Sequence, residues 1–170
     1  MAGKHPDDSH RAPGTSSVSD VRLLAAQLFN ETWRLMGLPD HSQDDISRMI
    51  GAAHASRFHW SQVPGHTPAH LARGDWLISR VYAELGRAEP ALYHARLVLG
   101  TCQENGIGDW DLAFAHEALA RAAAVAGDQQ TAERHLADAR RAAELIADPE
   151  DRALLESDLA SIPGVPQPAS

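Results

Sequence analysis

The feature that most constrains the fold is an internal repeat. When the sequence is shifted along itself by 41 residues without a gap, residues of one segment fall on identical residues of the next. The matched pairs are Gly65 with Gly106, Leu71 with Leu112, Ala72 with Ala113, Arg80 with Arg121, Gly86 with Gly127, Ala91 with Ala132, and His94 with His135. Repeats of roughly 20 to 50 residues are typical of stacked supersecondary units, because one unit alone cannot bury its apolar face. We therefore expect consecutive copies of one structural unit.

The repeated unit is expected to be helical. Alanine, leucine, arginine and glutamate are abundant, aromatic residues make up only 5% of the chain, and unbranched side chains lose little rotamer freedom in a helix. Side chains that cap helices recur: Ser19, Ser42 with Asp45 as a capping box, Thr67 before Pro68, Asp109 or Asp111, Asp128, and Asp148. These starts predict about seven helices. They indicate an all-α fold of tandem antiparallel helix hairpins with a short, polar C-terminal capping helix.

The length of the chain indicates one domain. Its 170 residues, 44% of them hydrophobic, are enough for a continuous core. Residues 1–16 are rich in proline, glycine, serine and histidine, and residues 163–170 are rich in proline. Neither segment has enough apolar surface to offset the entropy of ordering it. We expect a single helical-repeat domain over residues 17–162 between two disordered tails.

Charge and composition exclude several classes of protein. The net charge of −8 argues against nucleic-acid binding, because such proteins neutralise phosphates with clustered basic residues. Cys102 is alone, so no internal disulfide can form. Residues 1–16 lack the apolar core of a secretion signal, and no apolar run reaches membrane-spanning length. We expect a cytoplasmic protein that binds neither nucleic acid nor a membrane.

Each unit reads as a helix, a glycine turn and a second helix with small residues, and this pattern resembles the tetratricopeptide family. The family's small, aromatic, glycine, alanine and small apolar positions are filled by Ser79, Tyr82, Gly86, Ala91 and Val98. In the next unit they are filled by Ala120, Ala123, Gly127, Ala132 and Ala139, so alanine replaces the aromatic residue. The period exceeds the family's usual ~34 residues, as in the long-repeat branch that includes kinesin light chains, and the chain is also similar to an uncharacterised bacterial branch. The resemblance spans about residues 19–161 and implies a right-handed superhelix.

The resemblance also implies a concave groove, lined by the first helix of each hairpin. On the helix that begins at Pro68, apolar residues with helical spacing form a stripe, namely Leu71, Ile78, Val81, Tyr82 and Leu85. The family's ligand-contacting positions fall on the opposite side, at Arg73, Trp76 and Arg80. One period later they fall at Phe114, Glu117 and Arg121. In the first hairpin, by a register that depends on Gly37, they fall at Gln27, Glu31 and Arg34.

Such a groove predicts a non-catalytic module that binds a protein or peptide. Guanidinium groups bind carboxylates in pairs and stack on flat rings, which favours an acidic peptide, a chain terminus or a small anionic ligand. One alternative is that the arginines only solvate this face and pair with the chain's own Glu31, Glu84 and Glu117. Another is self-association, in which an exposed apolar helix face forms a homodimer. Trp110, next to a capping aspartate, is expected to be a hydrophobic staple rather than a ligand platform.

Polar residues interrupt the apolar face of the helix over residues 42–60. The period places His54 and Arg57 where the other repeats have apolar residues, and a buried guanidinium without a partner is costly. One interpretation is a structural ion pair of Arg57 with one of four acidic residues, Glu31, Glu104, Asp109 or Asp111. The other is a polar pocket in which Arg57 and His54 hold a small molecule, as a binding protein or an enzyme would.

Catalytic and metal-binding motifs are absent from the sequence. It has no glycine-rich phosphate loop, no Gly-x-Ser-x-Gly and no His-Glu-x-x-His motif. No pair among its 10 histidines has ligand spacing beside a cysteine or carboxylate cluster, and His94, His116 and His135 are expected at the surface. We therefore expect no metal, no cofactor and no catalytic residue.

Overall fold

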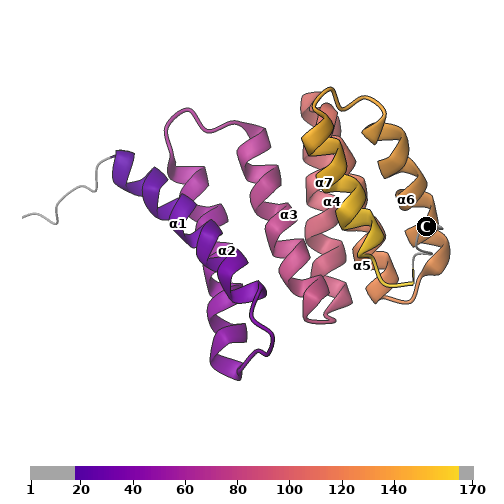
Figure 1. Ribbon diagram of the computed structural model, residues 1–170. Helices are drawn as coiled ribbons and strands as arrows, with labels where there is room; N and C mark the ends of the chain where they lie inside the picture. Colours follow the sequence, from indigo (N-terminus) through magenta and orange to yellow (C-terminus); the bar gives the residue numbers. More distant parts are fainter. Residues whose placement is uncertain (1–17, 165–170) are drawn as a thin grey trace, which may run out of the picture.

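Seven α-helices follow one another over residues 18–164, the part of the chain that the computed structural model describes (Figure 1). They are α1 (Val18–Met36), α2 (Gln43–Gln62), α3 (Pro68–Glu84), α4 (Ala88–Asn105), α5 (Asp109–Val125), α6 (Gln129–Ala143) and α7 (Pro149–Ala160). These residues contain no strand, so the predicted all-α fold is confirmed. The predicted tails, residues 1–16 and 163–170, lie outside the described residues except for Pro163 and Gly164.

Most helices begin where the sequence predicts. Ser42 and Asp45 form a capping box at α2, in which the Asp45 N–H donates to Ser42 Oγ and the Ser42 N–H to Asp45 Oδ2, both at 3.1 Å. Asp128 and Asp148 accept hydrogen bonds from first-turn N–H groups of α6 and α7. α5 begins at Asp109, one of the two predicted starts, but the expected aspartate cap is wrong because the N-cap residue is Gly108 and no side chain caps the helix.

The 41-residue period is visible in the backbone. Gly86 and Gly127 both have positive φ, 67° and 75°, a conformation that a residue without Cβ adopts readily. The residue after each glycine donates its N–H to the carbonyl five residues earlier, at 2.8 and 2.9 Å. The two bends are therefore equivalent, and each one ends the first helix of a hairpin.

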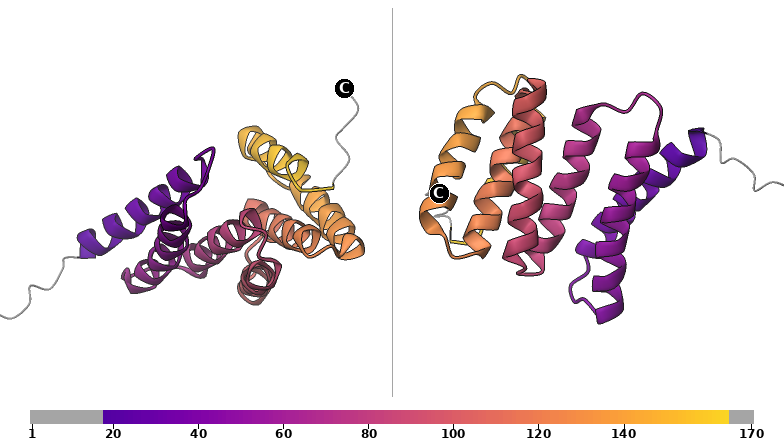
Figure 2. Two further views of the ribbon diagram at one scale, coloured as in Figure 1. Left: turned by 90° about the horizontal axis from the view of Figure 1, so that it is seen from below. Right: turned by 180° about the vertical axis from the view of Figure 1, so that it is seen from behind.

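Consecutive helices pack as neighbouring pairs. The most extensive contacts lie within α1–α2, α3–α4 and α5–α6, and the pairs are joined through α2–α3 and α4–α5. α3 and α5 also touch each other, so the first helices of successive hairpins share one face of the layer. The left view of Figure 2 shows α1 and α7 on that side of the layer and α4 on the other. Within the described residues, no helix combines the length and the apolar character needed to cross a membrane.

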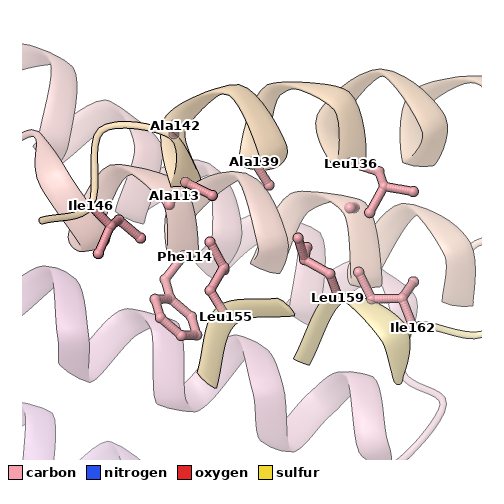
Figure 3. Packing of buried hydrophobic residues seen from close by; sticks show 11 residues of the cluster. Ala113, Phe114, Leu136, Ala139, Ala142, Ile146, Leu155, Leu159 and Ile162 are labelled. Atoms are coloured by element: carbon pink, nitrogen blue, oxygen red, sulfur yellow. The ribbon is translucent and has the colours of Figure 1, made fainter. Parts of the chain in front are cut away.

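α7 buries apolar side chains at the C-terminal end of the layer. Leu155 of α7 lies beside Phe114 of α5, and Leu159 of α7 and the following Ile162 lie toward the inner face of α6 (Figure 3). Leu155 and Leu159 are fully buried. The helix is thus more than a polar cap, because it lies over the α5 positions that were expected to line an open groove.

Candidate functional site

A cavity of about 300 Å³ lies between α1 and α3, close to the end of α2 and the start of α5. Its lining is mostly apolar and comes from four helices: Ala26, Phe29 and Asn30 of α1, Trp60 of α2, His70, Arg73, Gly74 and Trp76 of α3, and Trp110 of α5. Three of the chain's 4 tryptophans therefore border one space. We refer to it as the tryptophan cavity.

Contacts with other rings hold each tryptophan in place. The Trp60 ring stacks on His70, with 4.8 Å between ring centroids and 24° between planes. Trp76 and Trp110 both pack edge to face on Phe114, at 5.5 and 5.3 Å. Edge-to-face and stacked pairs are favourable aromatic geometries, so the three indoles form stable walls.

Gly74 allows α2 and α3 to approach closely beside the cavity. A Cβ atom at this position would lie 2.5 Å from Cγ and 3.2 Å from the backbone Cα of Arg57. Ordinary contacts between carbon atoms are about 3.5–4.0 Å, so only glycine fits without displacing α2. The close approach brings Trp60 of α2 beside the α3 residues that line the cavity.

The cavity carries little unpaired charge. The Arg73 guanidinium donates through Nε and Nη2 to both carboxylate oxygens of Asp111, at 2.8 and 2.9 Å, and lies 4.5 Å over the Trp110 ring. Burial, followed by repulsion from Arg73, lowers the pKa of His70. His70 Nδ1 accepts from the Thr67 N–H at 3.1 Å, so the neutral ring carries its hydrogen on Nε2.

The predicted groove residues of α3 and α5 divide between two places. Arg73 and Trp76 border the tryptophan cavity. Phe114, Glu117 and Arg121 are at most 4% exposed, because α7 packs over this part of α5. α7 covers the positions of Phe114 and Glu117, whereas Arg121 and Arg80 border a separate space of about 320 Å³ beside the end of α7.

Glu117 is the centre of a buried ion-pair network. It is fully buried and accepts from Arg121 Nε at 2.6 Å, Trp76 Nε1 at 3.2 Å and Arg80 Nη1 at 3.5 Å. Arg80 Nη1 also lies 3.3 Å from a carboxylate oxygen of Asp158, and Arg121 Nη2 donates to the Asp158 carbonyl at 2.8 Å. The network therefore ties α3, α5 and α7 together and neutralises both arginines inside the protein.

The arginines of the predicted groove pair with carboxylates of the chain. This agrees with the alternative in which they bind the protein's own glutamates. Arg34 donates to both oxygens of Glu31 at 2.7 and 2.8 Å, and the pKa of Glu31 is lowered chiefly by this hydrogen bond. Arg80 donates to Glu84 at 3.0 Å. Gln27 is exposed at the surface of α1. The face therefore offers fewer free guanidinium groups than the sequence pattern indicates.

Arg57 forms an ion pair, but with none of the four predicted acids. Its Nε lies 3.2 Å from Asp75 Oδ2, and Asp75 Oδ1 lies 3.0 Å from His94 Nδ1. His94 was expected at the surface, yet its side chain is only 13% exposed. His54 is exposed, and its Nε2 lies 3.1 Å from the Tyr82 hydroxyl. Among the described residues every buried side-chain nitrogen and oxygen has a hydrogen-bond partner, so no unpaired buried group in this cluster is available to a ligand.

Sequence reasoning missed part of the cavity. Phe29, Trp60 and His70 were not predicted as site residues. Trp110 was expected to be a staple, but it lies in the first turn of α5 and borders the cavity. The sequence did contain a signal for this cavity. Aromatic residues are scarce in the chain, yet Trp60 and Trp110 both lie near helix ends, which stacked hairpins bring together.

No protein-family model matches the chain, and neither a curated protein nor a solved structure matches it. What the cavity binds must therefore follow from its own shape and chemistry.

Proposed function

We propose that the protein is a non-catalytic helical-repeat module of tetratricopeptide type, and that it binds a partner protein or peptide by enclosing an aromatic or large apolar side chain in the tryptophan cavity. The observation that carries this proposal is the convergence of Phe29, Trp60, Trp76 and Trp110 on one cavity, although they come from four separate helices. Aromatic side chains that border open space are unfavourable in water unless a ligand covers them. They are also the residues that dominate binding at protein interfaces.

The size of the cavity favours a single side chain as its occupant. Its volume of about 300 Å³ lies at the lower end of the range for ligand pockets. A cavity of about 150 Å³ accommodates benzene, so this space holds a phenyl or indole ring together with chain atoms beside it, and complete burial of a large apolar side chain contributes about 1.5–3 kcal/mol. Asn30 and the Nε2–H of His70 are neutral polar groups at the lining, suited to main-chain groups on either side of an anchor residue.

Charge pairing argues for recognition by the aromatic walls rather than by arginine. Asp111 engages Nε and one hydrogen of Nη2 of Arg73, so a carboxylate of a ligand meets only the remaining hydrogens of Nη1 and Nη2, beside a charge that Asp111 already balances. Arg80 and Arg121 are paired with Glu117. The acidic peptide or small anion favoured by the sequence pattern would therefore compete with carboxylates that the protein already supplies.

The assignment to the tetratricopeptide type is supported by the packing of the small residues. Ala91 is fully buried, and its carbonyl accepts from Ser79 Oγ at 2.9 Å, where α3 crosses α4. Ala132 and Ala139 are buried on α6, at positions that the family's repeat also reserves for small residues. The right-handed superhelix, the single domain over residues 17–162 and the cytoplasmic location are parts of this proposal.

A polar pocket at His54 and Arg57, holding a small molecule or serving an enzyme, is the weaker alternative. Asp75, which is 4% exposed and also contacts His94, already engages Nε of Arg57, so an anion at the terminal nitrogens of Arg57 would lie beside this carboxylate. No comparable geometric feature favours it over the tryptophan cavity.

Binding of short peptides tests the proposal. The peptides are terminally blocked Ser-x-Ser sequences in which x is tryptophan, phenylalanine, leucine, alanine or aspartate, and affinity is measured by saturation-transfer NMR. We expect tryptophan and phenylalanine to bind best, leucine less well, and alanine and aspartate not measurably, because only large apolar groups fill the cavity.

A pair of matched variants locates the binding. Ala26→Leu adds bulk to the cavity wall, whereas Ala137→Leu makes the same change on the exposed surface of α6. Ala26→Leu should weaken binding of the aromatic peptides about tenfold or more, and Ala137→Leu should leave it unchanged. Equal affinity of both variants, or a preference for the aspartate peptide, would refute the proposal.

A further inference from the structure

Hairpins α3–α4 and α5–α6 carry a polar pair at equivalent positions. The 41-residue period that relates the hairpins takes Asp75 to His116 and His94 to His135. In the first pair a carboxylate faces an imidazole; in the second, the Nδ1 atoms of His116 and His135 lie 3.1 Å apart. His116 and His135 had been expected at the surface, but their side chains are only 16% and 12% exposed, respectively. One Nδ1–H therefore donates to the other Nδ1 in a half-buried setting, and binding a metal ion at both nitrogens moves that hydrogen to Nε2 of its ring.

Asp138 of α6 completes a cluster of three ligand-type groups. Its Oδ2 lies 4.0 Å from His116 Nδ1 and 3.9 Å from His135 Nδ1. With the 3.1 Å between the two nitrogens, these separations define a triangle whose circumscribed circle has a radius of about 2.1 Å. Zn–N and Zn–O bonds measure about 2.0–2.2 Å. An ion at the centre of the triangle would thus lie in the plane of the three atoms at bonding distance from each, and a shift of Asp138 Oδ2 toward the histidines by roughly 0.6 Å would give the spacing of tetrahedral zinc.

The protonation state and orientation of these groups also suit a metal ion. Burial is the largest cause that lowers the pKa of both His116 and His135, so the rings are neutral at neutral pH, as metal ligands must be. The other oxygen of Asp138, Oδ1, contacts Arg141. That contact orients the carboxylate with Oδ2 toward the histidines, as outer partners of metal ligands do.

We propose that His116, His135 and Asp138 bind a divalent transition-metal ion, with Zn²⁺ as the first ion to test. Two nitrogens and one oxygen match the ligand preference of zinc, whereas Mg²⁺ and Ca²⁺ require oxygen ligands throughout. Three protein ligands leave one position for water, which reaches the cluster because Asp138 is 22% exposed. The ion joins α5 to α6 and so stabilises the third hairpin, independently of ligand binding in the tryptophan cavity.

Zinc uptake by the full chain tests this site. The protein is stripped with a chelator, incubated with zinc chloride and dialysed, and its metal content and melting temperature are then measured. The expected result is one retained zinc ion per chain and a higher melting temperature, because a ligand that binds only the folded state stabilises it. Replacing both histidines, His116→Gln with His135→Gln, should abolish both effects. Asp138→Asn should weaken affinity by roughly tenfold or more.

Two controls separate this site from the other histidines of the chain. His94→Gln removes the period-related residue, and His5→Asn with His10→Asn removes two histidines near the N-terminus; both proteins should retain the zinc. Because glutamine substitutions can disturb the hairpin, imidazole NMR signals of the wild-type chain give a second readout, and zinc should shift those of His116 and His135. No uptake by the wild-type chain, equal uptake by the His116→Gln/His135→Gln variant, or shifts confined to other histidines would overturn the proposal.

Discussion

The substitution Gly74→Ala tests the close packing that places Trp60 beside α3. The new Cβ would meet Arg57 at 2.5 Å from Cγ, 2.9 Å from Cβ and 3.2 Å from Cα. The Cγ atom can move with its flexible side chain, but Cα belongs to the backbone of α2. The Cβ of Arg57 is also fixed by that backbone and lies 2.9 Å away, so normal contact at about 3.5 Å or more requires α2 to move away from α3 by roughly 0.6 Å or more.

Two opposing effects decide the size of the change. Overpacking of a tight contact costs about 1–3 kcal/mol, and the upper part of that range applies because backbone must move. Alanine in place of glycine gains about 1 kcal/mol within a helix. We expect a net loss of about 1–2 kcal/mol in the free energy of unfolding, or roughly 3–6 °C in melting temperature for a chain of this length.

Other helical glycines supply matched controls. A Cβ at Gly51 in α2 or at Gly100 in α4 would meet nothing within 4 Å. Gly51→Ala and Gly100→Ala should therefore stabilise the protein by about 0.5–1 kcal/mol. Urea unfolding followed by circular dichroism measures all three variants. If Gly74→Ala stabilises the protein as the controls do, then α2 and α3 do not approach as described.

Three further predictions concern ionisable side chains. Glu117→Gln should lower the free energy of unfolding by about 3–5 kcal/mol, because it leaves Arg80 and Arg121 without their shared buried carboxylate. The control Glu104→Gln, at an exposed position, should change the free energy of unfolding little. Equal urea midpoints of the two variants would contradict this prediction. Because the pKa of His70 is lowered in the folded protein, the unfolded chain binds a proton at this residue more readily. The contribution of neutral His70 to stability is therefore complete above the ordinary histidine pKa of about 6.5 and is lost as the pH falls below that value. His70→Gln keeps the capping acceptor and should show a shallower loss of melting temperature on acidification; an unchanged slope would count against this role of His70. Burial raises the pKa of the Cys102 thiol to about 11, so alkylation at mildly alkaline pH should follow global unfolding and accelerate in urea; rapid labelling of the native protein would show that this thiol is accessible.

Features that depend on local sequence could be predicted. The capping box of Ser42 and Asp45 involves residues three apart, and the bends at Gly86 and Gly127 follow from a conformation that glycine adopts readily. The repeat then placed the helices in pairs, because each amphipathic hairpin needs a neighbour. The all-α fold and the order of the elements follow from these signals.

Contacts between distant segments could not be predicted in the same way. The spacing of Leu155 and Leu159 indicates that α7 buries one face, but not that it does so against Phe114 and over the groove positions of α5. The pairing of Arg57 with Asp75 likewise depends on how α2 crosses α3. The 41-residue period did contain a signal for the contact between His116 and His135. It relates Asp75 to His116 just as it relates His94 to His135, so two residues in contact in one hairpin correspond to two histidines in the next.

A crystal structure of the protein soaked with 4-bromophenol would test the central claim most directly. Anomalous scattering from bromine locates this small aromatic probe without reference to the rest of the density. We predict a bromine peak inside the space bounded by Phe29, Trp60, Trp76 and Trp110. A peak only elsewhere on the surface, or a cavity closed by direct packing of α1 on α3, would contradict the proposed binding site.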